Sequence, residues 1–185
     1  SLLPLDERTP RRPLSPYGVT KLAGATYLDA YQALHGLSGT TLALANVYGP
    51  RQDPHGEAGV VAIFARRLLA ERSCVVYGSG GQTRDFVFVG DVADAFLRAG
   101  DYTGGDLFNI GTGVETSVNQ LYGSMASLAE GPADPEREAE RAGEILRSSL
   151  KSTLASEKLG WAPTTSLRDG LRETLDWFAA NAPAD

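Results

Sequence analysis

Apolar residues recur at helical spacing between Ser15 and Gly36, and this pattern predicts the first helix of the chain. Ser15 is a typical N-cap residue, Pro16 suits the first turn, and Gly36 suits the position after the last turn. The apolar positions are Leu22, Ala23, Tyr27, Ala30, Tyr31 and Leu34. We expect much of this helix to be buried against a sheet or a partner helix. Residues 1–14, rich in Pro and Arg, are typical of a loop.

Short runs of strand-forming residues alternate with helical patterns along the rest of the chain. Strands are predicted over residues 41–47, 73–77, 84–89 and 107–110, with an edge strand over 145–150. Helices are predicted over residues 59–71, 91–100 (starting at Asp91), 117–129, 153–159 and 167–180. The polar, charge-dense segment 130–144 is predicted to be a surface loop. Alternation of strands and helices indicates an α/β fold.

The first helix carries a candidate catalytic pair, Tyr17 and Lys21. Residues four apart lie on one face of a helix, so the phenol and the ammonium can share a ligand. A nearby positive charge favours the phenolate and lowers the pKa of a tyrosine, which then can act as a general acid or base. A half-buried tyrosine beside a surface lysine is the structural alternative, and the spacing alone does not decide between them.

Composition narrows the class of protein. The 185 residues are 42% apolar, as in ordinary globular domains, and a net charge of −6 disfavours a nucleic-acid partner. One cysteine, Cys74, and two histidines exclude an internal disulfide and disfavour a zinc cluster, so no metal is expected. We find no apolar run long enough to span a membrane and no export signal at the first residues. These features predict a cytoplasmic protein without a membrane partner.

Five runs, in this order, together resemble one family. They are 15–21 (SPYGVTK), 46–52 (NVYGPRQ), 77–87 (YGSGGQTRDFV), 109–113 (NIGTG) and 159–163 (LGWAP). The chain is thereby similar to the extended short-chain dehydrogenases/reductases that act on nucleotide sugars, the NAD-dependent epimerases and dehydratases, and within them to the UDP-glucose 4-epimerase group. The resemblance, more than the spacing, makes Tyr17 and Lys21 the expected catalytic pair.

The resemblance implies a fold and a division into parts. We expect the C-terminal part of a Rossmann-type doubly wound parallel sheet plus a small α/β substrate-binding domain. Residues 1–50 would supply the catalytic helix and the next strand, and residues 51–185 mostly the substrate-binding region, with about 84–112 partly returning to the Rossmann domain. The glycine-rich turn that holds the NAD pyrophosphate and the family's catalytic Ser or Thr have no match here. We therefore expect the 185 residues to be a fragment that by itself would not hold NAD or catalyse.

The implied activity is NAD-dependent epimerisation of a UDP-hexose at C4 through a transient 4-keto sugar. Tyr17 would remove the 4-hydroxyl proton while the C4 hydride passes to NAD, and Lys21 would hold the nicotinamide ribose. The sugar would be UDP-glucose or UDP-galactose, or an N-acetyl form, because Ser148 is small where the family places a side chain beside the C2 substituent. A homodimer is expected, since the family uses the Tyr17 helix between subunits.

Further site residues follow from the resemblance alone. Arg84 and Arg141 match residues that bind the substrate pyrophosphate, and Asn46 matches a donor to a substrate phosphate. The cofactor-binding residues would be Tyr17, Lys21, Leu44 and Ala45. The substrate-binding residues would be Asn46, Val60, Val75, Tyr77, Arg84, Arg141 and Ser148, with Val75 and Tyr77 bordering the uracil.

Two other functions stay open. One is a different nucleotide-sugar enzyme of the same fold, a 4,6-dehydratase or a UDP-glucuronate decarboxylase. The other is a non-catalytic nucleotide-sugar sensor, which the intact Tyr17 and Lys21 disfavour.

Overall fold

A computed structural model describes residues 2–55, 59–141 and 143–181 as an α/β structure. The helices are α1 (Pro16–His35), α2 (Val60–Leu69), α3 (Val89–Gly100), α4 (Val118–Leu128), α5 (Thr153–Leu159) and α6 (Leu167–Ala180). The strands are β1 (Thr41–Leu44), β2 (Asn46–Tyr48), β3 (Val75–Tyr77), β4 (Thr83–Arg84), β5 (Phe86–Phe88), β6 (Leu107–Ile110), β7 (Thr116–Ser117) and β8 (Glu136–Glu138). The bounds predicted for β6, α5 and α6 are confirmed.

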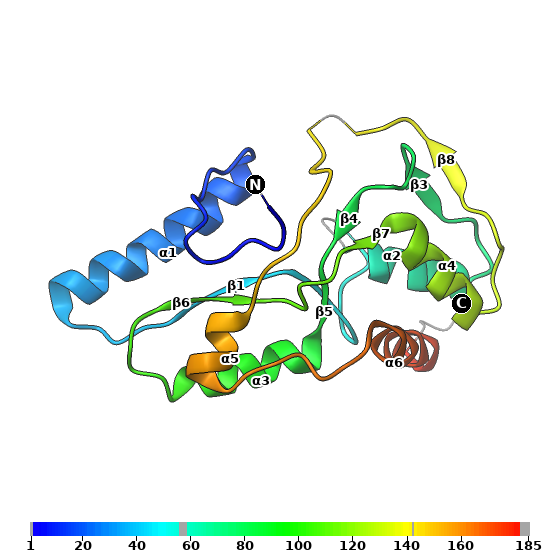
Figure 1. The fold of residues 1–185 in the computed structure, drawn as a ribbon. Helices are drawn as coiled ribbons and strands as arrows, with labels where there is room; N and C mark the ends of the chain where they lie inside the picture. Colours follow the sequence, from blue (N-terminus) through cyan, green and yellow to red (C-terminus); the bar gives the residue numbers. More distant parts are fainter. Residues whose placement is uncertain (1, 56–58, 142, 182–185) are drawn as a thin grey trace.

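The strands pair mainly in parallel (Figure 1). β1 pairs with β6, β2 with β5 and β3 with β8 in parallel, while β4 and β7 are antiparallel. The predicted strand over 41–47 is divided, because the chain changes partner there. Ala45 N donates to Ile110 O at 2.9 Å, and the next residue, Asn46, donates to Asp85 O at 2.8 Å. This extended segment therefore joins the β6 side of the structure to the β5 side.

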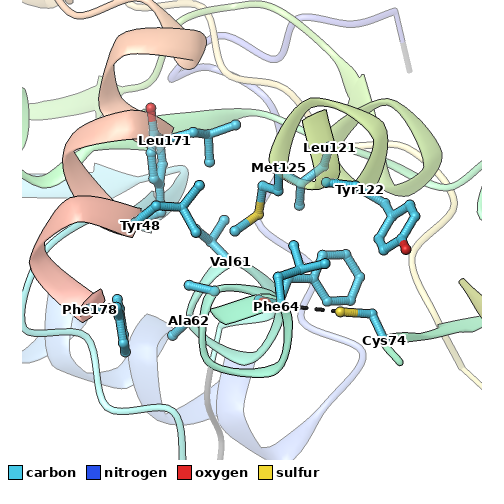
Figure 2. Close-up of a cluster of buried hydrophobic side chains, with 14 of the residues drawn as sticks. Tyr48, Val61, Ala62, Phe64, Cys74, Leu121, Tyr122, Met125, Leu171 and Phe178 are labelled. Atoms are coloured by element: carbon cyan, nitrogen blue, oxygen red, sulfur yellow. Dashed lines mark hydrogen bonds between the residues drawn. The ribbon is translucent and has the colours of Figure 1, made fainter. Parts of the chain in front are cut away.

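One hydrophobic core lies among α2, α4 and α6 (Figure 2). Phe64 of α2 packs edge-on against Tyr122 of α4, with ring centroids 5.7 Å apart. Leu171 and Phe178 reach the same core from α6. The Cys74 thiol is fully buried there and donates to the Phe64 carbonyl at 3.9 Å.

A second core lies where α3 and α5 pack against β6. Trp161 is its largest buried side chain, and its indole N–H donates to the Asp91 carbonyl at 2.9 Å. β5 contributes side chains to both cores, because successive side chains of a strand point to opposite faces. Phe86 and Phe88 lie in the first core and Val87 in the second. The predicted strand over 84–89 is thus confirmed only in part, since it breaks at Asp85.

α1 differs from the prediction. Its ends are as expected: the Ser15 hydroxyl accepts the Gly18 amide at 3.1 Å, and Gly36 closes the helix at φ 65°. However, no residue of α1 is buried within the described part of the chain. Tyr27 is 70% exposed and Leu34 75%. Figure 1 shows why, because the helix lies to one side of the strands and is covered only along part of its length. Burial of this helix against the strands of its own chain is therefore wrong, and burial against a partner helix stays a prediction.

The remaining differences have local causes. α3 begins at Val89, before Asp91, because the Asp91 carboxylate accepts bonds from Thr164 and Thr165 instead of capping the helix. The predicted loop 130–144 contains the strand β8, whose three side chains are all exposed. The predicted edge strand 145–150 is wrong, since only Leu150 forms a bridge, to Leu5.

In the part of the chain that the structure describes, no helix has the length and apolar character needed to cross a membrane. The proposed division at residue 50 stays a prediction.

Candidate active site and nucleotide-sugar site

Tyr17 and Lys21 lie together on the exposed surface of α1. Lys21 Nζ is 5.3 Å from the centroid of the Tyr17 ring, and Tyr17 is 60% exposed. Among the described residues, no group forms a hydrogen bond with the Tyr17 hydroxyl or with Lys21 Nζ. The pair therefore presents a phenol hydroxyl and a positive charge to a ligand that binds this face.

The strands that follow α1 in sequence carry the residues predicted to contact the cofactor and a substrate phosphate. Leu44, at the end of β1, is 40% exposed, Ala45 is half-buried and Asn46 is exposed. Asn46 is fixed through its main chain, which pairs with Phe86 in β5. These three residues follow one another at the carboxyl end of a parallel strand, which is where open α/β sheets bind ligands.

Arg84, the last residue of β4, lies in a cluster of polar groups. Its Nη1 donates to the carbonyls of Thr83 at 2.8 Å and Ile145 at 2.6 Å. Its Nη2 is 3.5 Å from Glu144 Oε1, and both side chains are only about one-fifth exposed, at 19% and 21%. Glu144 also accepts from Gln82 Nε2 at 3.4 Å. No sequence pattern marks Glu144 as a partner of Arg84, although it lies three residues after Arg141.

Arg141 stacks on the ring of Tyr77. The guanidinium carbon is 3.7 Å from the ring centroid, a close cation–π contact. The Tyr77 carbonyl accepts from Gln82 Nε2 at 3.2 Å, which links this stack to the Glu144–Arg84 pair. Arg84 and Arg141, the two residues predicted to bind the pyrophosphate, therefore belong to one network that also contains Glu144.

Asp85, beside Arg84, has a structural role that sequence analysis did not assign. The buried carboxylate accepts four hydrogen bonds: Oδ1 from the Thr112 amide at 2.9 Å and hydroxyl at 2.6 Å, and Oδ2 from the Gly113 amide at 3.0 Å and the Leu150 amide at 3.1 Å. A Cβ at Gly111 would lie 2.6 Å from Oδ2, so this turn requires glycine. Asp85 therefore fixes the loop after β6 and the segment that carries Ser148.

Ser148 is half-buried and held from both sides. Before it, Arg147 pairs with Glu115, whose carboxylate also accepts from the Thr83 hydroxyl at 2.5 Å. The Arg147 guanidinium and the Thr83 hydroxyl lower the pKa of Glu115 to about 2. After it, the Ser149 carbonyl accepts the Leu5 amide at 2.9 Å.

Two further predicted residues are half-buried. Val75 begins β3, two residues before Tyr77, and Val60 begins α2. The structure brings predicted residues together in two groups, Tyr17 with Lys21 and Arg84 with Arg141 and Tyr77. Among the residues described, no hydrogen bond or ion pair joins the two groups directly.

Comparison with known proteins identifies the family. The family model described as "NAD dependent epimerase/dehydratase family" matches residues 2–111. The UDP-glucose 4-epimerase of Mycolicibacterium smegmatis is 50% identical over 95% of this chain and 56% of its own length. Human dTDP-D-glucose 4,6-dehydratase is 31% identical over 95% of this chain and 51% of its own length.

The same likeness extends to the fold. The crystal structure of Thermotoga maritima UDP-glucose 4-epimerase with UDP-glucose is 42% identical and superposes with a TM-score of 0.95, covering 97% of this chain and 58% of that one. The chain spans just over half the length of these epimerases. The predicted Rossmann-type α/β fold is confirmed. The chain belongs to the NAD-dependent epimerase/dehydratase family.

Proposed function

We propose that this chain supplies the catalytic helix and the substrate-binding region of an NAD-dependent UDP-hexose 4-epimerase. The observation that carries the proposal is the exposed Tyr17–Lys21 pair, with the ammonium 5.3 Å from the phenol ring. The similarity of the chain to UDP-glucose 4-epimerases supports the choice of reaction.

Tyr17 acts as the acid and base. As phenolate it takes the proton of the sugar 4-hydroxyl during oxidation, and as phenol it returns a proton when the 4-keto sugar is reduced. Lys21 binds the nicotinamide ribose through its ammonium donors. NAD, when bound, supplies the hydride chemistry at C4. An exposed phenol and ammonium on one helix face fit the hydroxyl-rich ribose of that cofactor, and Leu44 and Ala45 border its nicotinamide.

Arg84 and Arg141 bind the pyrophosphate of the substrate. Guanidinium groups carry a fixed charge and paired donors that match phosphate oxygens. Asn46 donates to a phosphate, Val75 and Tyr77 border the uracil through their main chain, and Val60 contacts the substrate from α2. A tight nucleotide anchor is needed because the keto sugar must rotate in the site without leaving it.

Ser148 selects the sugar. Its short side chain leaves room at C2, so N-acetylhexosamines are accepted together with glucose and galactose. A bulkier residue at this position would exclude the N-acetyl forms and leave the other sugars unaffected.

The complete protein is a cytoplasmic homodimer in this proposal. Val19, Leu22, Ala23, Thr26, Tyr27 and Ala30 line an apolar groove on α1. By helical spacing they lie on the side of α1 opposite Tyr17 and Lys21, so subunit contact leaves the catalytic face open.

A 4,6-dehydratase is the second candidate, because the chain is also similar to dTDP-D-glucose 4,6-dehydratases. The candidates are separated by incubating the complete protein with UDP-glucose, UDP-galactose, their N-acetyl counterparts, dTDP-glucose and UDP-glucuronate, and identifying products by NMR. Interconversion of C4 epimers is expected. A 4-keto-6-deoxy product would replace the proposal by the dehydratase, as decarboxylation of UDP-glucuronate would replace it by the decarboxylase. Binding of UDP-sugars with turnover of none would identify a sensor.

A further inference from the structure

We propose that Tyr77 is a positioning residue whose ring holds Arg141 in place for the substrate pyrophosphate. This inference rests on the proposed function, in which Arg141 binds that pyrophosphate. The resemblance places Tyr77 at the uracil, and the structure gives its side chain a different contact. The Arg141 guanidinium carbon lies 3.7 Å from the centroid of the ring.

Strand pairing and hydrogen bonds hold the main chain that carries the Tyr77 ring. Tyr77 ends β3 and pairs in register with Glu138 of β8. The amide of the following residue, Gly78, donates to the Glu138 carbonyl at 2.9 Å, and the Tyr77 carbonyl accepts from Gln82 at 3.2 Å. Since β8 ends only three residues before Arg141, the same pairing brings the arginine back over the ring.

Arg141 has no other partner in residues 2–55, 59–141 and 143–181 to orient it. Neither a carboxylate nor a carbonyl there forms an ion pair or hydrogen bond with its guanidinium. Arg84 differs, because Glu144 and two carbonyls hold it. The orientation of Arg141 therefore depends on the stack with Tyr77.

Stacking suits an arginine that must remain available to a ligand. A carboxylate partner would occupy the in-plane N–H donors of the guanidinium. An aromatic ring contacts only the face of the guanidinium, so all the guanidinium N–H donors stay directed outward for phosphate oxygens. The ring thus reduces the freedom of the side chain before binding without competing with the pyrophosphate.

The test is a double-mutant cycle in the complete protein, read out by calorimetric titration with UDP and by the KM and kcat for UDP-galactose. Tyr77→Leu is expected to raise the Kd for UDP and the KM about 3- to 10-fold, the effect of losing one cation–π contact, with kcat changed less than about 2-fold. Tyr77→Phe keeps the ring and should bind like wild type. In an Arg141→Ala background, Tyr77→Leu should have no further effect.

An equal loss of affinity from Tyr77→Leu with and without Arg141 would overturn the inference, because the ring would then act on the ligand or the fold. A wild-type protein that binds no UDP would overturn the proposed function as well. A measurement without ligand separates the two. NMR relaxation of the Arg141 Nε–H group should show greater mobility in Tyr77→Leu than in wild type, and equal mobility would refute the positioning role whatever the substrate.

Discussion

Arg147 binds Glu115 through two parallel hydrogen bonds, from Nε at 2.8 Å and from Nη2 at 2.5 Å. The two residues are 32 positions apart in the chain, and Glu115 immediately precedes β7. Because the carboxylate also accepts the Thr83 hydroxyl at 2.5 Å, it joins β4, the start of β7 and the segment 144–150. This contact holds the chain next to Ser148 in the absence of a strand there.

The Glu115 contacts predict a pH dependence of stability. They lower the pKa of this carboxyl from 4.5 to about 2 in the folded protein. A lowered folded pKa gives stability that is complete above the unfolded pKa and is lost as the pH falls through the folded one. The stability difference between wild type and Glu115→Gln should therefore be constant above about pH 5 and shrink between pH 4.5 and pH 2.

Urea unfolding of the complete protein at several pH values measures this difference. Asp94→Asn is the matched control, since it removes a carboxylate from an exposed pair with Arg98. Its effect should be small at every pH. A Glu115→Gln effect that persisted unchanged to pH 2 would show that the contact does not depend on the charge of the carboxylate.

Asp85→Asn should lower the free energy of unfolding by about 2–4 kcal/mol. Each carboxylate oxygen of Asp85 accepts at least one main-chain amide, so an amide nitrogen at either position would face an N–H donor. The buried donor left without an acceptor then carries its full desolvation cost. Denaturant unfolding measures the change, and the exposed Asp94→Asn variant should stay within about 0.5 kcal/mol of wild type. An equal change in the free energy of unfolding for Asp85→Asn and Asp94→Asn would contradict the role of the buried Asp85 carboxylate in stability.

Helix ends and buried faces could be predicted from the sequence where local residues decide them. α1 starts at its Ser15 cap and stops at Gly36, and α6 buries Leu171, Leu175 and Phe178 as its periodicity predicts. β8 could not be predicted, because its side chains are exposed and only its main-chain pairing with β3 makes it a strand. The exposure of the apolar face of α1 could not be predicted for a similar reason. The apolar pattern of the helix predicts that another surface covers this face, but it does not indicate which polypeptide supplies that surface.

The candidate site was predictable to a similar degree. Spacing alone places Tyr17 beside Lys21, and the resemblance selects Arg84 and Arg141. Neither indicates that Glu144 pairs with Arg84, because the partners lie 60 positions apart and only the fold brings them together. The stack of Arg141 on Tyr77 is likewise a product of the pairing of β3 with β8.

Two glycines in helix interiors should respond oppositely to alanine. At Gly170 in α6, a Cβ would lie 2.2 Å from the Tyr48 hydroxyl and 2.9 Å from Phe88, so Gly170→Ala should destabilise the protein by about 1–3 kcal/mol. At Gly123 in α4, nothing beyond the adjacent residues and the helix's own backbone lies within 4 Å of the added methyl, so Gly123→Ala should stabilise the protein by up to about 1 kcal/mol. Thermal and urea unfolding compare the two variants. Destabilisation by both would mean that the space beside Gly123 is filled in the complete protein.

The proposed dimer predicts the effect of a charge in the apolar groove of α1. Ala30 lines this groove, and Ala30→Arg would place a guanidinium in the subunit contact. The variant should shift the mass of the complete protein from dimer to monomer, as measured by size-exclusion chromatography with light scattering. Ala179→Arg, at an exposed position of α6, is the control and should leave the mass unchanged. A dimeric Ala30→Arg variant would place the subunit contact elsewhere.

Tyr17→Phe should reduce kcat for UDP-galactose about 10²- to 10⁴-fold, the usual contribution of a general acid or base. The change removes only the hydroxyl, which forms no hydrogen bond with a described residue, so neither folding nor UDP binding should change. Calorimetric titration with UDP and thermal unfolding check these two points. Tyr27→Phe removes a hydroxyl from another exposed tyrosine of the same helix, 70% exposed against 60% for Tyr17, and should keep full activity. Equal kcat values for the two variants would exclude Tyr17 as the proton-transfer group, and loss of UDP binding by Tyr17→Phe would instead assign its hydroxyl to substrate anchoring.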